Sequence, residues 1–356
     1  MDLNSKQEIL ADFTKKETLS SILNFGRQVF SGWQKALDFN FPVDFSQVNS
    51  LVVCGMGGSR FPAIITRELF KEEIKVPFFI NDDYSLPGFV DDHTLLVACS
   101  YSGSTQEVLT NVQKGFERKA KIFGVSSGGK LKELAQKLKF PCLIYDTSYN
   151  PSNQPRMGFG YTLGILFGLL TKLELLDYPQ STIERSLSSC EKFIKDFGVD
   201  VPEERNLAKT VAKEIFEKVP IFVVGEFLIG AGNALANQTN ETSKSFSEFR
   251  VIPELNHHLM EGLKHPAEIH SCHKFLFIFS SLYSPLIQKR FQITKEVVEK
   301  NQVQTIWIET PGENKIEQTF YILVFGLYLT FYLSLLYQED STKVPFVDYF
   351  KEKLNQ

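Results

Sequence analysis

The sequence predicts an α/β protein built from two units, each a parallel sheet with helices on both faces. Apolar runs of strand length alternate with amphipathic helical stretches, which is typical of parallel sheets joined by crossover helices. The length of 356 residues is enough for two hydrophobic cores of about 150 residues each. An apolar strand, a glycine-containing loop and a helix follow one another in both halves of the chain. We therefore predict two tandem, doubly wound, Rossmann-like domains.

The first half of the chain supplies the first of these domains. The first forty residues have an amphipathic helical pattern, so we predict an N-terminal helical segment at residues 1–40. Strands and helices then alternate through residues 41–178, which we assign to the first domain. The predicted strands of this domain lie in SLVVC, VPFFIND, LLVACS, AKIFGVS and FPCLIYD.

The second half begins after the break at Asp177-Tyr178-Pro179, and we assign residues 179–356, with their C-terminal helices, to the second domain. The segment VPIFVVGEFLIGAGN echoes LVVCGMGGSR about 170 residues earlier, with an apolar strand and a glycine loop that leads into a helix. Further strands are predicted in KFLFIFSS and VQTIWIE. The echo suggests a tandem duplication of one module.

Composition and charge are those of an ordinary soluble globular protein, with 43% hydrophobic and 22% charged residues. Because the formal net charge is −4, we expect no nucleic-acid partner. The five cysteines are scattered without a CxxC pair, which suits a reducing compartment. The N-terminal residues lack the basic and apolar regions of a signal peptide. We therefore expect a cytoplasmic protein.

Residues 320–337 form an uncharged run of 18 residues, which reaches the length of a membrane span. The run contains six residues with a hydroxyl group and has no basic flanks. We therefore expect a buried helix in the core or at a subunit contact, and no membrane partner. A membrane span is the alternative.

A loop rich in hydroxyl groups lies between the predicted strand at residues 95–99 and the helix that follows Gln106. The start of a helix has unpaired backbone N–H groups and a partial positive charge, so this junction can hold an anion. It has no lysine and is not a Walker-type loop. The alternative is an ordinary helix cap. The residues concerned are Ser100, Ser102, Gly103, Ser104 and Thr105.

A second loop, CGMGGSR, places Gly55, Gly57 and Gly58 before Ser59, so that a ligand can approach the backbone closely. The spacing is not GxGxxG, and the acidic pair at residues 82–83 is a weak match to the ribose-binding position. A nicotinamide enzyme is therefore a minor alternative.

Five of the six histidines gather within residues 257–273, which raises the alternative of a metal site. Their spacings match no tetrahedral pattern, and Pro266 interrupts the segment. We therefore expect no metal ion. The candidate ligands are His257, His258, His265, His270, Cys272 and His273.

Five ordered motifs carry a family resemblance that covers roughly residues 50–356: GMGGS, SYSGST, PSNQPRMGFGY, NQTNE and PELNHHLMEGL. The chain resembles the bifunctional phosphoglucose/phosphomannose isomerases, whose domains are of the SIS (sugar isomerase) type. The resemblance implies two tandem SIS domains, a homodimer, a hexose 6-phosphate substrate, and aldose–ketose isomerisation without a cofactor.

The resemblance also implies which residues bind the substrate. Ser100, Ser102 and Thr105 would hold the phosphate, while Gly58 and Ser59 would face the sugar. Thr342 falls near a residue that helps to admit the mannose epimer.

The implied catalytic residues come from both halves of the chain. Arg156 would stabilise the enediolate oxygen, although a surface ion pair is its alternative role. Glu241 would be the general base. His257, with His258 as a rival, and Lys351, with Lys353 as a rival, would assist ring opening.

The chain departs from the family pattern at Arg60, where glycine is usual; this arginine could supply positive charge or point to solvent. A sugar-phosphate regulator would need the hydroxyl loop but neither base nor proton shuttle, and it is the main alternative function. A glucosamine 6-phosphate synthase would need a glutaminase domain with an N-terminal cysteine, which this sequence lacks.

Overall fold

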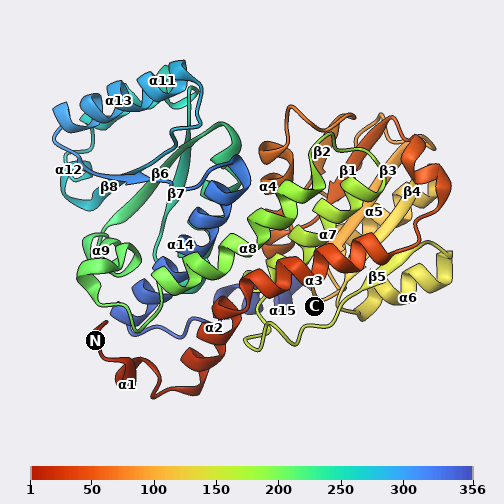
Figure 1. Ribbon diagram of the computed structural model, residues 1–356, viewed down its shortest axis with the longest axis horizontal. Coiled ribbons are helices and arrows are strands. Elements are labelled where there is room, and N and C mark those ends of the chain that lie inside the picture. Colours follow the sequence, from red (N-terminus) through yellow and green to blue (C-terminus); the bar gives the residue numbers. More distant parts are fainter. Residues whose placement is uncertain (1, 355–356) are drawn as a thin grey trace.

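The structure, a computed structural model, describes residues 2–354 and confirms the α/β architecture with two separate parallel sheets (Figure 1). The first sheet has the order β2-β1-β3-β4-β5, and the second has the order β7-β6-β8-β9. Every neighbouring pair in both sheets is parallel. The strands are β1 Ser50–Cys54, β2 Phe78–Asn81, β3 Thr94–Ser100, β4 Lys121–Ser126, β5 Cys142–Ile144, β6 Val219–Gly225, β7 Glu248–Ile252, β8 His273–Phe279 and β9 Gln304–Glu309.

The two sheets share one connection pattern. In each sheet the first strand, β1 or β6, pairs with the second and third strands of its half. The fourth strand pairs with the third. Gly55 and Gly225 lie at the ends of β1 and β6 and open equivalent loops into α4 and α10. This repetition of topology supports the predicted duplication, and β5 is the strand without a counterpart.

Strand β7 was not predicted from the sequence. Its sequence, EFRVI, alternates charged and apolar residues over a short stretch, and all but its last residue are only partly buried. The strand lies at the edge of its sheet, where one side remains open to polar side chains. Strand β3, by contrast, is buried along its whole length and reads as a continuous apolar run.

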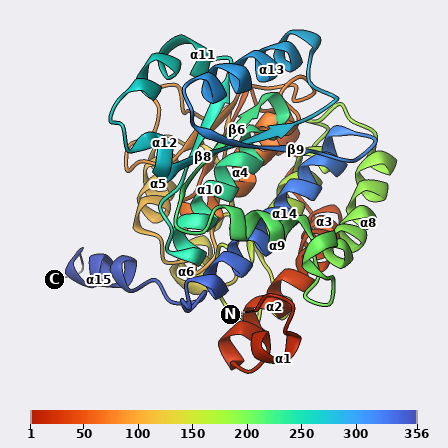
Figure 2. The ribbon, with the colours of Figure 1, turned by 90° about the vertical axis from the view of Figure 1, so that its left-hand side faces the viewer.

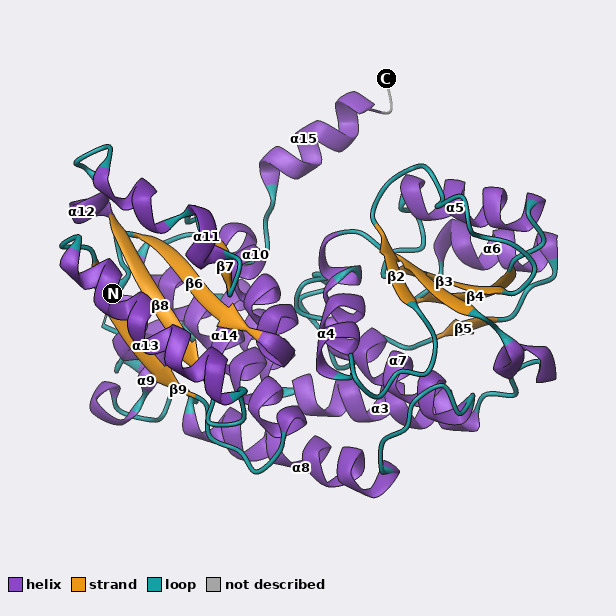
Figure 3. Ribbon diagram, turned by 90° about the horizontal axis from the view of Figure 1, so that it is seen from above, coloured by secondary structure: helices purple, strands orange, loops and turns teal. Residues whose placement is uncertain are grey.

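Helices cover both faces of the sheets and join the two halves (Figures 1 and 3). The N-terminal helices run toward the first sheet, where α3 packs along α7 and Phe25 contacts Phe159 with ring centroids 5.0 Å apart. The α-helices are α1 Lys6–Ile9, α2 Phe13–Leu23, α3 Phe25–Asp38, α4 Phe61–Leu69, α5 Gln106–Glu117, α6 Gly129–Leu138, α7 Phe159–Lys172, α8 Gln180–Asp196, α9 Leu207–Glu214, α10 Ile229–Ser243, α11 Leu255–His258, α12 Ile269–Cys272, α13 Pro285–Lys300, α14 Lys315–Leu336 and α15 Pro345–Leu354.

Helix α14 contains the uncharged run and is a core helix of this chain. It is long and apolar enough to cross a membrane, but 94% of its most apolar window is buried inside the molecule, where it packs against α8, α9 and α10. The Tyr332 hydroxyl donates to the carbonyl of Phe197 at 2.7 Å, and Thr330 and Ser334 donate to carbonyls of their own helix. The prediction of a buried helix is confirmed, and these bonds satisfy three of its hydroxyl groups, whereas the buried Tyr328 hydroxyl has no protein partner among the described residues.

Helix α15 projects from the body of the molecule, as Figures 2 and 3 show. None of its described residues is buried, and its large apolar side chains, including Phe346 and Phe350, are exposed.

The two sheets lie on opposite sides of the predicted boundary between residues 178 and 179. Helix α3 belongs to the packing of the first half, whereas Lys6 forms an ion pair with Asp200 in the second half. The division into residues 1–40, 41–178 and 179–356 remains our proposal.

Candidate active site

The hydroxyl loop lies at the carboxyl end of β3, where parallel sheets bind their ligands. The Ser100 and Thr105 hydroxyl groups are 2.8 Å apart, and the backbone N–H of Ser104 donates to Ser102 Oγ at 3.3 Å. Thr105 is the N-cap of α5, but its side chain accepts no capping hydrogen bond. The loop therefore differs from an ordinary Ser/Thr cap and leaves donors at the helix start for an anion.

Gly103 is required by the shape of this loop. Its φ is +67°, and a Cβ atom at this position would lie 1.9 Å from the carbonyl oxygen of Gly128. Glycine alone combines this backbone conformation with such a close approach. The prediction that Gly103 allows the chain to turn is confirmed.

The glycine loop is held between the hydroxyl loop and the segment that carries Arg156. A Cβ on Gly58 would lie 2.7 Å from the backbone nitrogen of Arg156, and Ser59 Oγ accepts from the backbone N–H of Tyr101 at 3.0 Å. Arg60 Nε forms an ion pair with Asp82 at 2.7 Å. Arg60 is therefore paired with an acidic side chain rather than pointing alone into solvent, and a contribution of its charge to the loop stays a prediction.

Arg156 lies at the centre of the site and is 1% exposed, so the surface ion pair considered from the sequence is wrong. A guanidinium group has five N–H hydrogens, and each of them has an acceptor here. Desolvation lowers the pKa of Arg156, while Glu241 and Asp340 raise it. The acceptors are Thr242 Oγ1 for Nε at 3.2 Å, Gln154 Oε1 and Glu241 Oε2 for Nη1 at 3.0 and 3.5 Å, and the carbonyls of Ser341 and Thr342 for Nη2 at 2.6 and 3.1 Å.

Glu241 lies in the last turn of α10, and its side chain is 33% exposed. Burial raises the pKa of its carboxyl group above the ordinary value, although Arg156, Lys351 and Lys244 act in the opposite direction. A carboxylate whose pKa is raised toward neutrality is suited to act as a general base. The structure thus brings Glu241 and Arg156 together from the two halves of the chain.

The last helix brings a lysine close to this pair. Lys351 on α15 lies near enough to Glu241 to favour its ionised form. Lys353 instead lies over the ring of Tyr349, with its Nζ 5.9 Å from the centroid. The choice of Lys351 over Lys353 stays a prediction.

Thr342 lies beside Arg156 and forms one hydrogen bond through its carbonyl and another through its hydroxyl. Its carbonyl accepts from Arg156 Nη2, and its hydroxyl donates to Asp340 at 2.6 Å.

Sequence reasoning missed Gln154 and Lys244. Lys244 Nζ donates to the carbonyls of Thr242 and Asp340, and desolvation lowers its pKa to about 8. The sequence signal for Gln154 was its position two residues before Arg156, and the signal for Lys244 was its position three residues after Glu241.

His257 lies elsewhere in the chain. It is exposed on α11, which lies beside α13 on the outer side of the second half (Figure 1). Within residues 2–354 it shares no hydrogen bond or ion pair with Glu241 or Arg156, whereas His258 Nδ1 is 3.0 Å from the carbonyl of Glu254. One chain therefore does not bring His257 to the other predicted catalytic residues.

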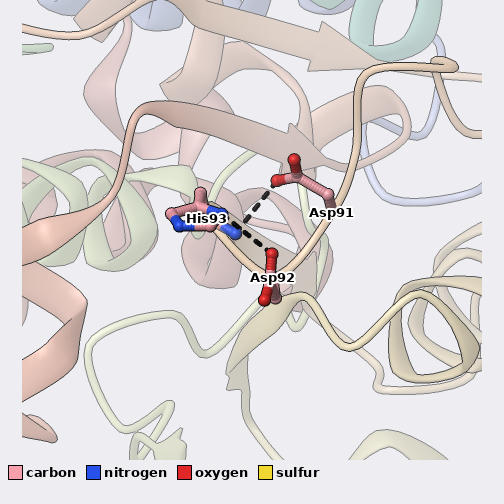
Figure 4. Close-up of side chains that lie close together, drawn as sticks. All are labelled: Asp91, Asp92 and His93. Carbon is pink, nitrogen blue, oxygen red and sulfur yellow. Dashed lines mark hydrogen bonds and ion pairs between the residues drawn. The ribbon is translucent and has the colours of Figure 1, made fainter.

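The histidine-rich window does not assemble metal ligands within the described residues. His270 Nε2 lies 3.3 Å from the carbonyl of Leu263, and Cys272 Sγ lies 3.1 Å from His273 Nδ1. The one group with sufficiently close ligand atoms among residues 2–354 is the exposed cluster Asp91, Asp92 and His93 (Figure 4). That cluster precedes β3, at the end of the strand opposite to the hydroxyl loop.

Comparisons with known proteins identify the family of the chain. Residues 204–354 match the family of the bacterial phospho-glucose isomerase C-terminal SIS domain. The bifunctional phosphoglucose/phosphomannose isomerase of Caldicellulosiruptor bescii is 30% identical over 338 residues, covering 94% of this chain and 98% of the relative.

Two crystal structures share the fold. A hypothetical protein from Thermus thermophilus aligns with a TM-score of 0.75 and 14% identity, over 99% of this chain and 95% of the other. The tagatose-6-phosphate ketose/aldose isomerase of Escherichia coli aligns with a TM-score of 0.67 and 14% identity, over 94% and 95%.

Proposed function

Because the chain belongs to the family of bifunctional phosphoglucose/phosphomannose isomerases, we propose that it interconverts glucose 6-phosphate and mannose 6-phosphate with fructose 6-phosphate. The observation that carries this proposal is the contact between Glu241 and the buried guanidinium of Arg156. Aldose–ketose isomerisation needs a base that moves a proton between C2 and C1 and a cation near the negative oxygen that forms. This pair supplies both.

The phosphate of the substrate binds at the hydroxyl loop. Ser100, Ser102 and Thr105 offer hydroxyl donors beside the start of α5, whose backbone N–H groups and dipole favour an anion. Gly58 and Ser59 lie between the hydroxyl loop and Arg156, where they face the sugar. Neutral donors at a helix start are sufficient for a monophosphate.

Proton transfer uses Glu241. The carboxylate removes the proton from C2 of the open-chain aldose, the electrons of the C2–H bond form a C1–C2 double bond, and the aldehyde oxygen becomes an anion. Arg156 stabilises this enediolate. Protonated Glu241 then returns the proton to C1, while the hydroxyl proton on O2 moves to O1 and leaves the ketone at C2. The glucose and mannose epimers differ only at C2, so both lead to the same enediolate.

Ring opening requires groups that move a proton between the ring oxygen and the anomeric hydroxyl. Lys351 lies near Glu241 and serves this step. We assign the second group to His257 of a second subunit, because His257 is exposed and distant from the site of its own chain. Thr342, which lies beside Arg156, helps to admit the mannose epimer.

The protein therefore acts as a homodimer in this proposal. The net charge of −4 and the burial of α14 support a soluble, cytoplasmic enzyme with neither a nucleic-acid nor a membrane partner. A sugar-phosphate-binding regulator is less favoured, because it would have no use for a carboxylate held against a buried arginine.

The test is a coupled assay of glucose 6-phosphate and mannose 6-phosphate conversion, with and without a chelator, for the wild type and Glu241→Gln. Glutamine keeps the shape but cannot accept the proton, so the rate should fall at least about a hundredfold while fructose 6-phosphate still binds. The acidic limb of the wild-type pH profile should lie above the ordinary carboxyl value, because burial raises the pKa of Glu241.

In deuterated water the wild type should exchange label into C1 or C2, and the variant should not. Exchange at the wild-type rate in Glu241→Gln would show that another group is the base. Binding of sugar phosphates without turnover by the wild type would favour the regulator, and loss of activity with the chelator would contradict a metal-independent reaction.

A further inference from the structure

The Nη1 group of Arg156 is the part of the guanidinium that faces side chains able to move. Nε bonds to a buried threonine hydroxyl, and Nη2 bonds to two backbone carbonyls. Nη1 instead divides its two hydrogens between the amide of Gln154 at 3.0 Å and the carboxylate of Glu241 at 3.5 Å. The neutral acceptor is therefore closer to Nη1 than the charged one.

This division limits the ion pair between Arg156 and Glu241. An arginine in close contact with a carboxylate strongly favours the ionised acid, and a longer contact favours it less. Here one Nη1 hydrogen is taken by Gln154, both Nη2 hydrogens go to the carbonyls, and one hydrogen remains for Glu241. We infer that Gln154 is a positioning residue, whose amide oxygen holds Nη1 of Arg156 away from Glu241, keeps their ion pair long and so preserves the basicity of that carboxylate.

The surroundings of Gln154 are consistent with this role. The preceding loop is braced by Asn150, whose side-chain amide donates to the carbonyl of Gln154 at 3.0 Å, and by Ser152, whose backbone N–H donates to Ser21 Oγ. Within residues 2–354, Nε2 of Gln154 has no protein acceptor, so one end of the amide binds Arg156 and the other remains available to the site.

A test of the role of Gln154 must leave the other charged groups near Glu241 unchanged. Lys351 on α15 and Lys244 at the end of α10 favour its ionised form, and Asp340 acts on both Arg156 and Lys244. None of these groups is altered when Gln154 is replaced. A change in the titration of Glu241 in the uncharged variant Gln154→Met therefore reports on the Gln154–Arg156 contact.

Two replacements of similar shape should shift the titration of Glu241 in opposite directions. Gln154→Met removes the acceptor, so Nη1 of Arg156 can move closer to Glu241, strengthen the ion pair and lower the pKa of that carboxyl group. Gln154→Glu places a carboxylate beside Arg156 that competes for the guanidinium and repels Glu241, so the pKa of Glu241 should rise. We expect shifts of about one pH unit in each direction, the lower range for a nearby charge.

The inference rests on the proposed role of Glu241, so the readout must not depend on activity alone. The carboxyl carbon of Glu241 is titrated by NMR in full-length protein labelled at glutamate and assigned by comparison with Glu241→Gln. Gln136→Met and Gln136→Glu, at an exposed position of α6, are the matched controls and should leave the titration unchanged.

Opposite shifts in the two Gln154 variants support the inference, and parallel shifts of the acidic limb of kcat/KM would link it to turnover. Shifts in the same direction, or none in folded variants, would overturn it. If the NMR shifts appear but no variant, nor the wild type, isomerises sugar phosphates, the positioning role stands and the proposed function fails.

Discussion

Removal of two hydroxyl groups from the predicted phosphate site tests where the substrate binds. In Ser102→Ala/Thr105→Ala the loop loses two donors to the phosphate, each worth about 1.5 kcal/mol as a charge-assisted hydrogen bond. The sum of about 3 kcal/mol corresponds to roughly a 150-fold loss of binding. Part of it is offset, because Thr105 must give up its bond to Ser100 and because Ser102 is exposed in the free protein.

We therefore expect the apparent KM for glucose 6-phosphate to rise by one to two orders of magnitude, about 10-fold to 100-fold. The value of kcat should change much less, since the phosphate contacts are made equally in the ground state and the transition state. Inhibition by inorganic phosphate should weaken in parallel, because phosphate alone uses the same donors.

The assay is steady-state kinetics with glucose 6-phosphate, and the matched control is Thr182→Ala/Ser188→Ala on α8, which removes the same two kinds of hydroxyl far from the loop. The control should retain the wild-type KM. A KM that stays at the wild-type value in Ser102→Ala/Thr105→Ala would place the phosphate site elsewhere and refute our reading of the hydroxyl loop.

Three further predictions concern the loop, the charges of the site and assembly. Gly103→Ala should lower the free energy of unfolding by about 1–3 kcal/mol and raise KM, because φ is +67° and the new Cβ would meet the Gly128 carbonyl; an unchanged denaturation midpoint would contradict it. The Lys244 ammonium is destabilised by burial in the folded state, so its folded pKa of about 8 lies below the ordinary lysine value of 10.5. This penalty is fully present below pH 8 and is relieved as the pH rises toward 10.5, so the stability of the wild type relative to Lys244→Met, measured by urea unfolding, should increase over that window; a flat difference would refute it. Untagged protein should be recovered without detergent and give the mass of a dimer in light scattering, whereas a monomer would remove the second-subunit role of His257.

The strands and their helices were predictable because periodicity is a local property. The buried run of β3 and the helix after Gln106 are visible in a window of about ten residues, as is the apolar character of α14. Strand β7 was not predicted, because a strand at the edge of a sheet can carry charged residues. Its short segment therefore has only a weak apolar pattern.

The candidate site was predictable only in part, for a physical reason. Glu241 is one of many helix glutamates, and the family motif singled it out rather than any pattern of its own. The role of Gln154 depends on how the hydrogens of Arg156 are shared, and their acceptors lie up to 186 residues away in sequence. Such sharing is a property of three-dimensional contacts, which no local periodicity reports.

The burial of Arg156 has a consequence for how the molecule is assembled. Its guanidinium sits in the first half of the chain, but four of its five acceptors belong to residues 241, 242, 341 and 342 in the second half. Thr18 also meets Ser341 at 2.8 Å, so the beginning of the chain is tied to the same place. A first half on its own would lack these four acceptors, and burial of the guanidinium without them would be strongly unfavourable. Docking of the halves and formation of the site are therefore one event, and neither half can be exchanged for that of another protein without supplying these acceptors again.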